Sequence, residues 1–319
     1  MPASDLALLE PGVSVPAVIA DAGAKASYRF LEFFTANIRN PNTRAAYVRA
    51  LAPFLAWCEK HGRGLASIDP ITVAAYVEQL QTGYSKPTVK QHLAAIRMLF
   101  DWMVTGGVLP FNPAASVRGP KYVIKKGKTP VLKPDEARTL LDSIDVSDLS
   151  GLRDRALLAV MVYSFARVSA VVGMNVEDYY QQGKRWWIRL HEKGGKHHEV
   201  PAHHKAEEYL DAYIAAAGIG NDGRTPLWRS MTKERGYGEN RMTRIDVFRM
   251  IKRRCRQAEL GAKANCHTFR ATGITAYLLN GGTIENAQAI AAHESPRTTK
   301  LYDRTSDEIT LDEVERIGI

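Results

Sequence analysis

Residues 291–304 read AAHESPRTTKLYDR and combine a helix start with two side chains that can do chemistry. Ser295 is a favoured N-cap and Pro296 a favoured first helical residue, so a short helix should begin here. That helix would carry Tyr302, with His293 at the junction before it. Such a tyrosine is either a packed core residue or a nucleophile. A nucleophile needs an activating group and an anion-binding site from elsewhere in the chain.

The composition is that of a globular protein with a basic balance. The chain has 319 residues, enough for two domains with a core each, and 45% of them are hydrophobic. A formal net charge of +9 suits a polyanionic partner such as nucleic acid. Three cysteines without a CxxC pair argue against disulfides and zinc fingers. No apolar run reaches the length of a membrane span, and the first residues lack a signal's basic segment. We therefore expect a cytoplasmic protein with no membrane partner.

The first part of the chain predicts a helical domain behind a loose arm. Residues 1–22 contain prolines and small side chains, which favours a flexible arm. In residues 23–117, the segments around Leu51 and Leu93 place apolar residues three and four apart, as on the buried face of a helix. No alternating strand pattern interrupts them. Residues 23–117 are therefore predicted to form an all-helical domain.

A basic linker separates this domain from a second one. Residues 118–130 are rich in proline, glycine and lysine, which oppose a packed element. In residues 131–319, the apolar stretch RDRALLAVMVYSFARVSAVVGM (153–174) is expected to be a central core helix. The stretch KRWWIRLHEKGGKHHEVPA (184–202) alternates and turns at two glycines, as a β-hairpin does. Helices should resume at residue 203, so the fold class is mainly α with a small hairpin sheet.

Six polar residues of the second domain are not explained by packing alone. They are Arg167, Lys193, His267, Arg270, His293 and Tyr302. Arg167 interrupts an apolar stretch and needs an anion, because a lone buried charge is costly. His267 and Arg270 lie three residues apart and so share one face of a helix. Each of the six also has a structural interpretation, such as a helix cap, a core residue, a surface ion pair or a turn residue.

The order of these residues resembles that of the tyrosine recombinase, or phage integrase, family. The segments that carry the resemblance are TRAAYVRALAPFLAWC, SFARVSAVVGM, EKGGKHHEVP, CHTFRATGITAYLLNGG and AAHESPRTTKLYDR. The last four correspond to the family's active-site boxes in its chain order. The resemblance implies a SAM-like helical core-DNA-binding domain followed by a mixed α/β catalytic domain with a small β-hairpin sheet. It also implies a site-specific DNA recombinase.

The resemblance assigns a role to each candidate residue. Arg167 and Arg270 would clamp the scissile phosphate, because guanidinium groups offer planar paired donors and remain charged. Tyr302 would be the nucleophile, and His267 its proton acceptor. His293 would bind the phosphate or position the tyrosine.

Lys193, at the hairpin tip, would be the general acid. It would protonate the 5′ oxygen, which leaves poorly as an alkoxide. The product would be a 3′-phosphotyrosyl bond, and a 5′-hydroxyl from another strand would reverse the step. Neither a metal nor any other cofactor is required by this chemistry.

Two positions depart from the family pattern. Ala170 stands three residues after Arg167, where the family usually has an acidic residue that supports the site. Ala292 precedes His293, where glycine is common. These departures put the efficiency of the site in doubt, and they favour a mobile-element integrase over a chromosome-resolving enzyme.

The two domains are expected to close on double-stranded DNA. Basic residues that would contact phosphates are Arg44, Lys86, Lys90, Arg97, Arg118, Lys121, Lys125 and Lys126. A solvated basic face is the alternative for those on helices. Strand exchange needs two duplexes, so a homotetramer on paired sites is expected. The C-terminal segment 307–319 would dock on a neighbouring protomer, or fold back on its own domain.

Three rival functions stay open at this point. A metal enzyme is suggested by the histidines between residues 191 and 204, but their spacing fits neither HExxH nor a zinc finger. A DNA-binding accessory protein of the same fold that no longer cuts is supported only by Ala170. A type IB topoisomerase-like enzyme would share the tyrosine chemistry. The sequence does not give the target DNA, or distinguish integration from excision, transposition or dimer resolution.

Overall fold

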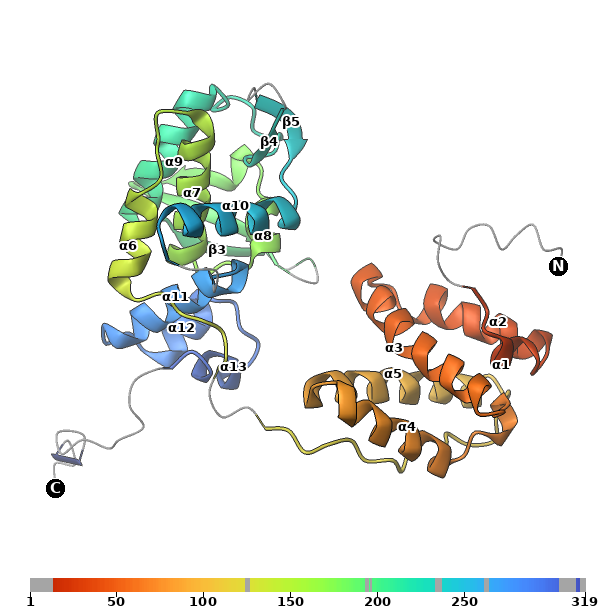
Figure 1. Cartoon of the computed structure of the whole chain (residues 1–319). Coiled ribbons are helices and arrows are strands. Elements are labelled where there is room, and N and C mark those ends of the chain that lie inside the picture. Colours follow the sequence, from red (N-terminus) through yellow and green to blue (C-terminus); the bar gives the residue numbers. More distant parts are fainter. Residues whose placement is uncertain are drawn as a thin grey trace. The chain divides into compact units, whose positions relative to one another are not determined.

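The chain forms two compact units, Met1–Val123 and Ile124–Ile319 (Figure 1). The computed structural model describes residues 14–123, 127–192, 195, 197–232, 237–260, 264–303 and 314–315. Each unit has a hydrophobic core of its own. Over these ranges, no helix is both long and apolar enough to span a bilayer.

All the regular elements in the described residues of the N-terminal unit are helical, as the sequence predicts. Its elements are α1 (Ala17–Ala20), α2 (Ala24–Glu32), a π-helical turn (Phe33–Asn37), α3 (Pro41–Lys60), a 3-10 turn (Leu65–Ser67), α4 (Pro70–Gly83) and α5 (Lys86–Thr105). Helices α3 and α4 begin with proline behind the N-caps Asn40 and Asp69, whose side chains accept backbone N–H groups. The apolar faces of α3 and α5 meet, and the rings of Phe54 and Phe100 pack edge to face at 6.0 Å.

Helix α1 lies in the stretch that the sequence assigned to a flexible arm. Val18 and Ile19 of α1 are buried in the core of the N-terminal unit. The structure therefore differs from the predicted arm at residues 17–20, because two adjacent apolar side chains in one helical turn have a core to pack against. Residues 1–13 lie outside the described ranges.

Over its described residues, the C-terminal unit is mainly helical with two small sheets. Its helices are α6 (Pro134–Asp142), α7 (Leu149–Tyr163), α8 (Val168–Gly173), α9 (His204–Ala217), α10 (Arg244–Gln257), α11 (Cys266–Leu279), α12 (Ile284–Ile290) and α13 (Pro296–Lys300). Its strands are β1 (Tyr179–Gln182), β2 (Arg185–His191), β3 (His197–Pro201), β4 (Arg229–Met231) and β5 (Tyr237–Arg241), preceded by a 3-10 turn (Val176–Asp178). Mainly α with small antiparallel sheets is the predicted fold class, and the structure confirms it.

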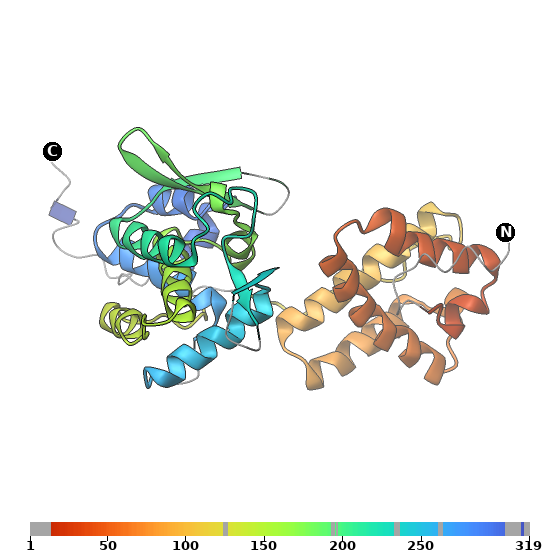
Figure 2. The same cartoon turned by 90° about the horizontal axis from the view of Figure 1, so that it is seen from above.

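The predicted hairpin is β2 and β3, and β1 extends it into a three-stranded antiparallel sheet in the order β1-β2-β3. Figure 2 shows this sheet along the side of the unit opposite α10. A second antiparallel pair, β4 and β5, occupies a region predicted to be helical. That expectation was wrong because these strands, RSM and YGENR, are short and carry no apolar alternation that would reveal them.

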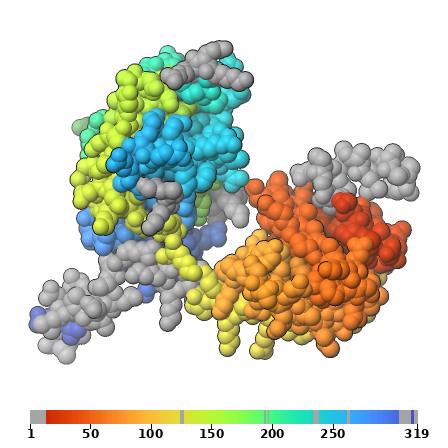
Figure 3. Space-filling view, in the orientation of Figure 1, coloured from red at the N-terminus to blue at the C-terminus, as the bar shows by residue number. Residues whose placement is uncertain are grey.

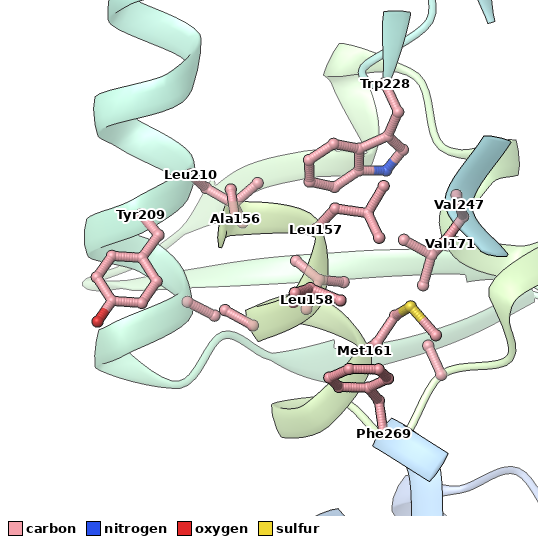
Figure 4. Close-up of a cluster of buried hydrophobic side chains, with 14 of the residues drawn as sticks. Ala156, Leu157, Leu158, Met161, Val171, Tyr209, Leu210, Trp228, Val247 and Phe269 are labelled. Carbon is pink, nitrogen blue, oxygen red and sulfur yellow. The ribbon is translucent and has the colours of Figure 1, made fainter. Parts of the chain in front are cut away.

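Helix α7 forms the centre of the C-terminal core. It packs against α9 and α11, and Leu157, Leu158 and Met161 are fully buried beside Trp228 and Phe269 (Figure 4). The apolar composition of α7 thus reflects burial on all sides.

The stretch 153–174 is two helices rather than the one predicted. Helix α7 ends at Tyr163, Phe165 has a left-handed φ of 53°, and Arg167 is the N-cap of α8. The break has a tertiary cause, since the carbonyl of Phe165 accepts a hydrogen bond from Arg270 of α11.

The end of the predicted linker contacts the segment that follows α13. The backbone N–H of Gly127 donates to the carbonyl of Leu301 at 3.0 Å, and the N–H of Leu132 donates to Oγ1 of Thr272 at 3.0 Å. Residues 124–126 lie outside the described ranges. The stretch from Gly127 onward is therefore bonded to the C-terminal unit.

Gly273 of α11 should be intolerant of any side chain, because α7 and α11 touch there. A Cβ at this position would lie 2.0 Å from the carbonyl oxygen of Val162. Backbone must move to relieve that clash, so Gly273→Ala should lower the free energy of unfolding by about 3 kcal/mol. Urea denaturation measures it. Gly173→Ala is the matched control, because its Cβ would meet nothing within 4 Å. Equal stability of the two variants would contradict the predicted close contact.

Candidate active site

Helices α11, α12 and α13 meet at one end of the C-terminal unit (Figure 1). Apolar residues of α11, α12 and the neighbouring loops form a small separate core, whose buried members are Phe165, Ala271, Ile274, Leu278, Ala287, Ala291 and Tyr302. Five of the six predicted site residues have described positions, and the structure places them around this core. Lys193 lies outside the described residues.

Tyr302 lies just after α13 rather than on it, because α13 ends at Lys300. The predicted N-cap is correct, since Ser295 Oγ accepts from the N–H of Arg297. The hydroxyl of Tyr302 is 2.5 Å from Nε2 of His267, and the side chain is 6% exposed. Thr275 Oγ1 donates to the carbonyl of Tyr302 at 2.9 Å. Tyr302 is thus held both by its backbone carbonyl and by its side-chain hydroxyl.

His293 forms one wall of the tyrosine site. Its ring stacks on that of Tyr302 with centroids 5.8 Å apart and an interplanar angle of 7°. Nδ1 lies 2.9 Å from Oγ1 of Thr299, and Gln288 donates to the backbone carbonyl of His293. Sequence reasoning missed Thr299, which orients the ring from within α13. The other ring nitrogen, Nε2, is then the one that could meet a substrate.

Arg270 is the most deeply buried of the candidate residues, with 1% of its surface exposed. Its Nη1 donates to the carbonyl of Phe165, and its Nη2 donates to the carbonyl of Ala291 at 2.6 Å. Both carbonyls adjoin left-handed backbone, since Phe165 has a φ of 53° and Ala292 a φ of 47°. Each such non-glycine residue costs roughly 1–2 kcal/mol. The left-handed φ also explains why glycine would suit position 292.

Arg167 pairs with a carboxylate that sequence reasoning missed. Its Nη1 donates to Oε2 of Glu192 at 2.5 Å. The Glu192 side chain is 6% exposed, whereas that of Arg167 is 38% exposed. Ala170 lies in the hydrophobic core and provides no polar group. In the sequence, Glu192 is simply an acidic residue at the end of a predicted hairpin strand. Acidic residues are common at such positions, so this one could not be recognised as a partner of Arg167.

Desolvation and charge set the protonation states of the pair at the centre of the site. Tyr302 is buried, and His267 is an exposed residue whose ring lies against it. Desolvation, reinforced by Arg270 and Arg167, lowers the pKa of His267 below its usual 6.5. Desolvation raises the pKa of Tyr302 above its usual 10, although the same two arginines oppose the rise. Tyr302 is therefore protonated at neutral pH, and the imidazole beside it is neutral and able to accept the proton. Burial also lowers the pKa of Arg270 to about 10, so it stays charged near pH 7.

His293 should make the folded protein sensitive to mild acid. Desolvation, then the charges of Arg270 and Arg167, lowers the pKa of His293 to about 3. The folded pKa is depressed, so below pH 6.5 the unfolded chain binds more protons and stability falls as the pH falls. Between pH 7 and pH 5 the free energy of unfolding should drop by on the order of 2 kcal/mol more than in His293→Gln. Urea unfolding at the two pH values measures the difference, and equal drops would contradict a neutral His293.

The other histidines between residues 191 and 204 have local partners. His191 Nε2 bonds Asp178 at 3.0 Å, His198 Nε2 lies 2.9 Å from the carbonyl of Ile290, and His203 stacks on Tyr163. Among the described side chains, no three histidine, cysteine, aspartate or glutamate residues gather as a metal site would require.

The residues predicted to contact DNA fall into three groups. Lys86, Lys90, Arg118 and Lys121 are exposed. Arg97 and Arg44 instead donate to backbone carbonyls of their own unit, Arg97 to Ala114 and Val117, and Arg44 to Ile38. Lys125 and Lys126 lie outside the described residues.

Sequence reasoning missed a basic face on α10. The exposed residues of this face are Arg249, Arg253 and Arg256. Figure 3 shows α10, in bright blue, on the surface of the C-terminal unit. The run RMIKRRCRQ (249–257) was the available signal.

The site therefore combines a protonated phenol, a neutral base in contact with it and two arginines. Guanidinium groups match the oxygens of a phosphodiester, and a phenol relieved of its proton can attack the phosphorus. The arrangement is suited to phosphoryl transfer onto tyrosine.

Comparisons with known proteins agree with this chemistry. The sequence pattern described as "Phage integrase family" matches residues 130–308, and that described as "Phage integrase, N-terminal SAM-like domain" matches residues 29–107. Tyrosine recombinase XerC of Thermodesulfovibrio yellowstonii is 30% identical over 239 residues, covering 74% of this chain and 77% of that protein. Tyrosine recombinase XerD of Pseudomonas aeruginosa is 27% identical over 266 residues, covering 82% and 86% of the two chains.

Solved structures share the fold at lower identity. XerH recombinase bound to palindromic difH substrate has a TM-score of 0.71 and 18% identity, covering 98% of this chain and 91% of that one. A lambda integrase tetramer bound to a Holliday junction has a TM-score of 0.65 and 16% identity, covering 96% and 87%. The chain therefore belongs to the phage integrase family of tyrosine recombinases, and is a site-specific DNA recombinase that cuts and rejoins strands.

Proposed function

We propose that Tyr302 is the nucleophile that forms a 3′-phosphotyrosyl bond with DNA. His267 accepts the phenolic proton as the tyrosine oxygen attacks the phosphorus. Arg167 and Arg270 stabilise the charge that grows on the non-bridging oxygens, the kind of preorganised stabilisation that is commonly the largest contribution to catalysis. Lys193 protonates the leaving 5′ oxygen, and His293 positions the tyrosine or binds the phosphate.

The 2.5 Å contact between Tyr302 Oη and His267 Nε2 carries this assignment. A buried phenol with a raised pKa needs a base within hydrogen-bond distance, and His267 is that base with its pKa lowered. Arg270 lies in the same site, and its charge acts on both residues. A purely structural tyrosine would not need a neutral histidine and two arginines around its hydroxyl.

The experiment traps the covalent intermediate. Duplexes that bind the protein are selected from a random library, and a nick is placed next to each phosphate so that a released 5′-hydroxyl fragment diffuses away. Denaturing gels then report an adduct, and mass spectrometry of the digested adduct identifies the attached residue. A nucleotide on the peptide that contains Tyr302 is the expected result. Binding without an adduct at any nick would leave a non-cutting accessory protein, whereas sequence-independent relaxation of supercoiled plasmid would indicate a topoisomerase.

DNA contacts in this proposal come from both units. Phosphate contacts come from Lys86, Lys90, Arg118 and Lys121, together with Lys125, Lys126, Arg44 and Arg97. The basic face of α10 adds contacts from the C-terminal unit. Binding of this kind weakens steeply with salt, because each neutralised phosphate releases counterions.

The biological role we propose is integration of a mobile element, by a homotetramer on paired sites. The divergence at Ala170 and Ala292 supports this role, and the tetramer follows from the need to cut two duplexes. The C-terminal segment 307–319 docks on a neighbouring protomer in this proposal. Of that segment, only residues 314–315 are described. Sedimentation on single and paired sites, with and without residues 307–319, tests the assembly.

A further inference from the structure

We propose that Glu192 is a positioning residue that holds the Arg167 guanidinium ready for the scissile phosphate. This inference rests on the proposed function of Arg167 as a phosphate clamp. Glu192 itself does not contact the reacting atoms. The carboxylate acts through the arginine.

The geometry of the pair supports this role. Glu192 directly follows β2, which is the central strand of the three-stranded sheet, and β2 packs against α8. Arg167 is the N-cap of α8, and its Nη1 lies 2.5 Å from the Glu192 carboxylate. One end of the pair is therefore fixed to a sheet and the other to a helix start. Such an anchor restricts the guanidinium to one direction.

The difference in exposure shows which partner faces the substrate. The Glu192 side chain is 6% exposed, so its charge is almost entirely withdrawn from water. Arg167 is 38% exposed, and a guanidinium has five N–H donors, of which this bond uses one. The carboxylate thus lies behind the arginine, whose remaining donors can still bind an anion.

No carboxylate from α8 can take this role. The residues that follow Arg167 in the first turn of the helix are valine, serine and alanine, and Ala170 is buried in the apolar core. The partner of Arg167 must therefore come from another element, and Glu192 is 25 residues away in the chain.

Glu192 also relieves repulsion between the two arginines. The positive charge of Arg167 lowers the pKa of Arg270, and the negative charge of Glu192 opposes that effect. Arg270 is buried and Arg167 is partly exposed, and the two cations repel one another until the phosphate arrives. A buried carboxylate beside one of them lowers this cost in the free enzyme. Both arginines can then be in place before DNA binds.

The experiment measures single-turnover cleavage of a nicked duplex at saturating protein, with DNA affinity measured separately. Glu192→Gln keeps the size of the side chain and removes the charge. We expect cleavage to fall about 10–100-fold while the Kd for DNA changes little, since loss of such a supporting partner has effects of this size. The cleavage rate of Glu192→Asp should lie between those of the wild type and Glu192→Gln, because aspartate keeps the charge but has a shorter side chain.

A double-mutant cycle tests whether the effect passes through Arg167. In an Arg167→Lys background, Glu192→Gln should cause little further loss, because the guanidinium it positions is gone. Glu199→Gln is the matched control on the same hairpin, since Glu199 pairs with Arg189 at 2.8 Å and its side chain is 42% exposed. It should cleave at the wild-type rate. Thermal melting confirms that each variant is folded, and Glu192→Asp carries the test if the glutamine variant is not.

Three outcomes would overturn the inference. Cleavage by Glu192→Gln at the wild-type rate would show that the pair has no effect on the reaction. Faster cleavage would show that the carboxylate competes with the phosphate for Arg167. An equal loss in both backgrounds would show that Glu192 acts elsewhere. Failure of the wild-type protein to form any adduct would instead contradict the proposed function itself.

Discussion

Tyr302→Phe should abolish the covalent protein–DNA adduct while duplex binding stays within about twofold. The ring still fills the small core around α11 and stacks on His293, so the fold is retained. The attacking oxygen is lost, and removal of a nucleophile from other covalent enzymes costs about a millionfold in rate. The hydroxyl also bonds His267, which is an exposed residue, so water can replace the lost partner. Stability should therefore fall by only about 0.5–1.5 kcal/mol.

Adduct formation on the nicked duplex measures cleavage, and a band-shift assay measures duplex binding separately. Tyr277→Phe is the control, because Tyr277 lies on the same helix as His267 and packs against the same small core. It should form adduct as the wild type does. An adduct that persists in Tyr302→Phe would assign the nucleophile to another residue.

Arg270→Lys should reduce cleavage by about 100–1000-fold even though the charge is conserved. Arg270 donates to two carbonyls that lie in different parts of the chain, Phe165 and Ala291, and its planar fork serves both at once. An ammonium group cannot reproduce that geometry, so both the phosphate clamp and the positive field at Tyr302 are displaced. Loss of one preorganised donor in comparable sites has this magnitude.

The control for Arg270→Lys must lose similar carbonyl contacts outside the site. Arg241 meets this need, because it donates to the carbonyls of Val172 and Met174 and to the side chain of Asn175. Arg241→Lys should lower the melting temperature as Arg270→Lys does, but should cleave normally at a temperature where both are folded. If the two variants lost cleavage to the same degree, the role of Arg270 would be structural.

Local periodicity and short-range spacing were sufficient to predict much of the fold. The apolar stripes around Leu51 and Leu93 are α3 and α5, and the alternating stretch with two glycines is the β2–β3 hairpin. Spacing along one helix also placed His267 and Arg270 on α11. These features depend on residues within a few positions of each other, so a single sequence contains them.

The features that sequence reasoning missed depend on distant partners. The break between α7 and α8 follows from a bond between Phe165 and Arg270, which are 105 residues apart. Strands β4 and β5 have no alternating pattern and exist through their pairing. Arg97 had the pattern of a surface cation, but its guanidinium reaches the carbonyls of Ala114 and Val117. None of these partners can be inferred from periodicity.

The sequence by itself therefore determined the helical fold class, the family resemblance and the identity of Tyr302, His267, Arg270 and Arg167 as candidates. The tertiary structure alone decided how they are placed. Tyr302 contacts His267, Arg270 donates to carbonyls beside two residues with left-handed φ, and Arg167 pairs with Glu192. The physical reason is that burial and the choice of hydrogen-bond partner set the charge state and direction of a polar side chain. Both are properties of the folded chain, because they arise only when segments distant in sequence are brought together.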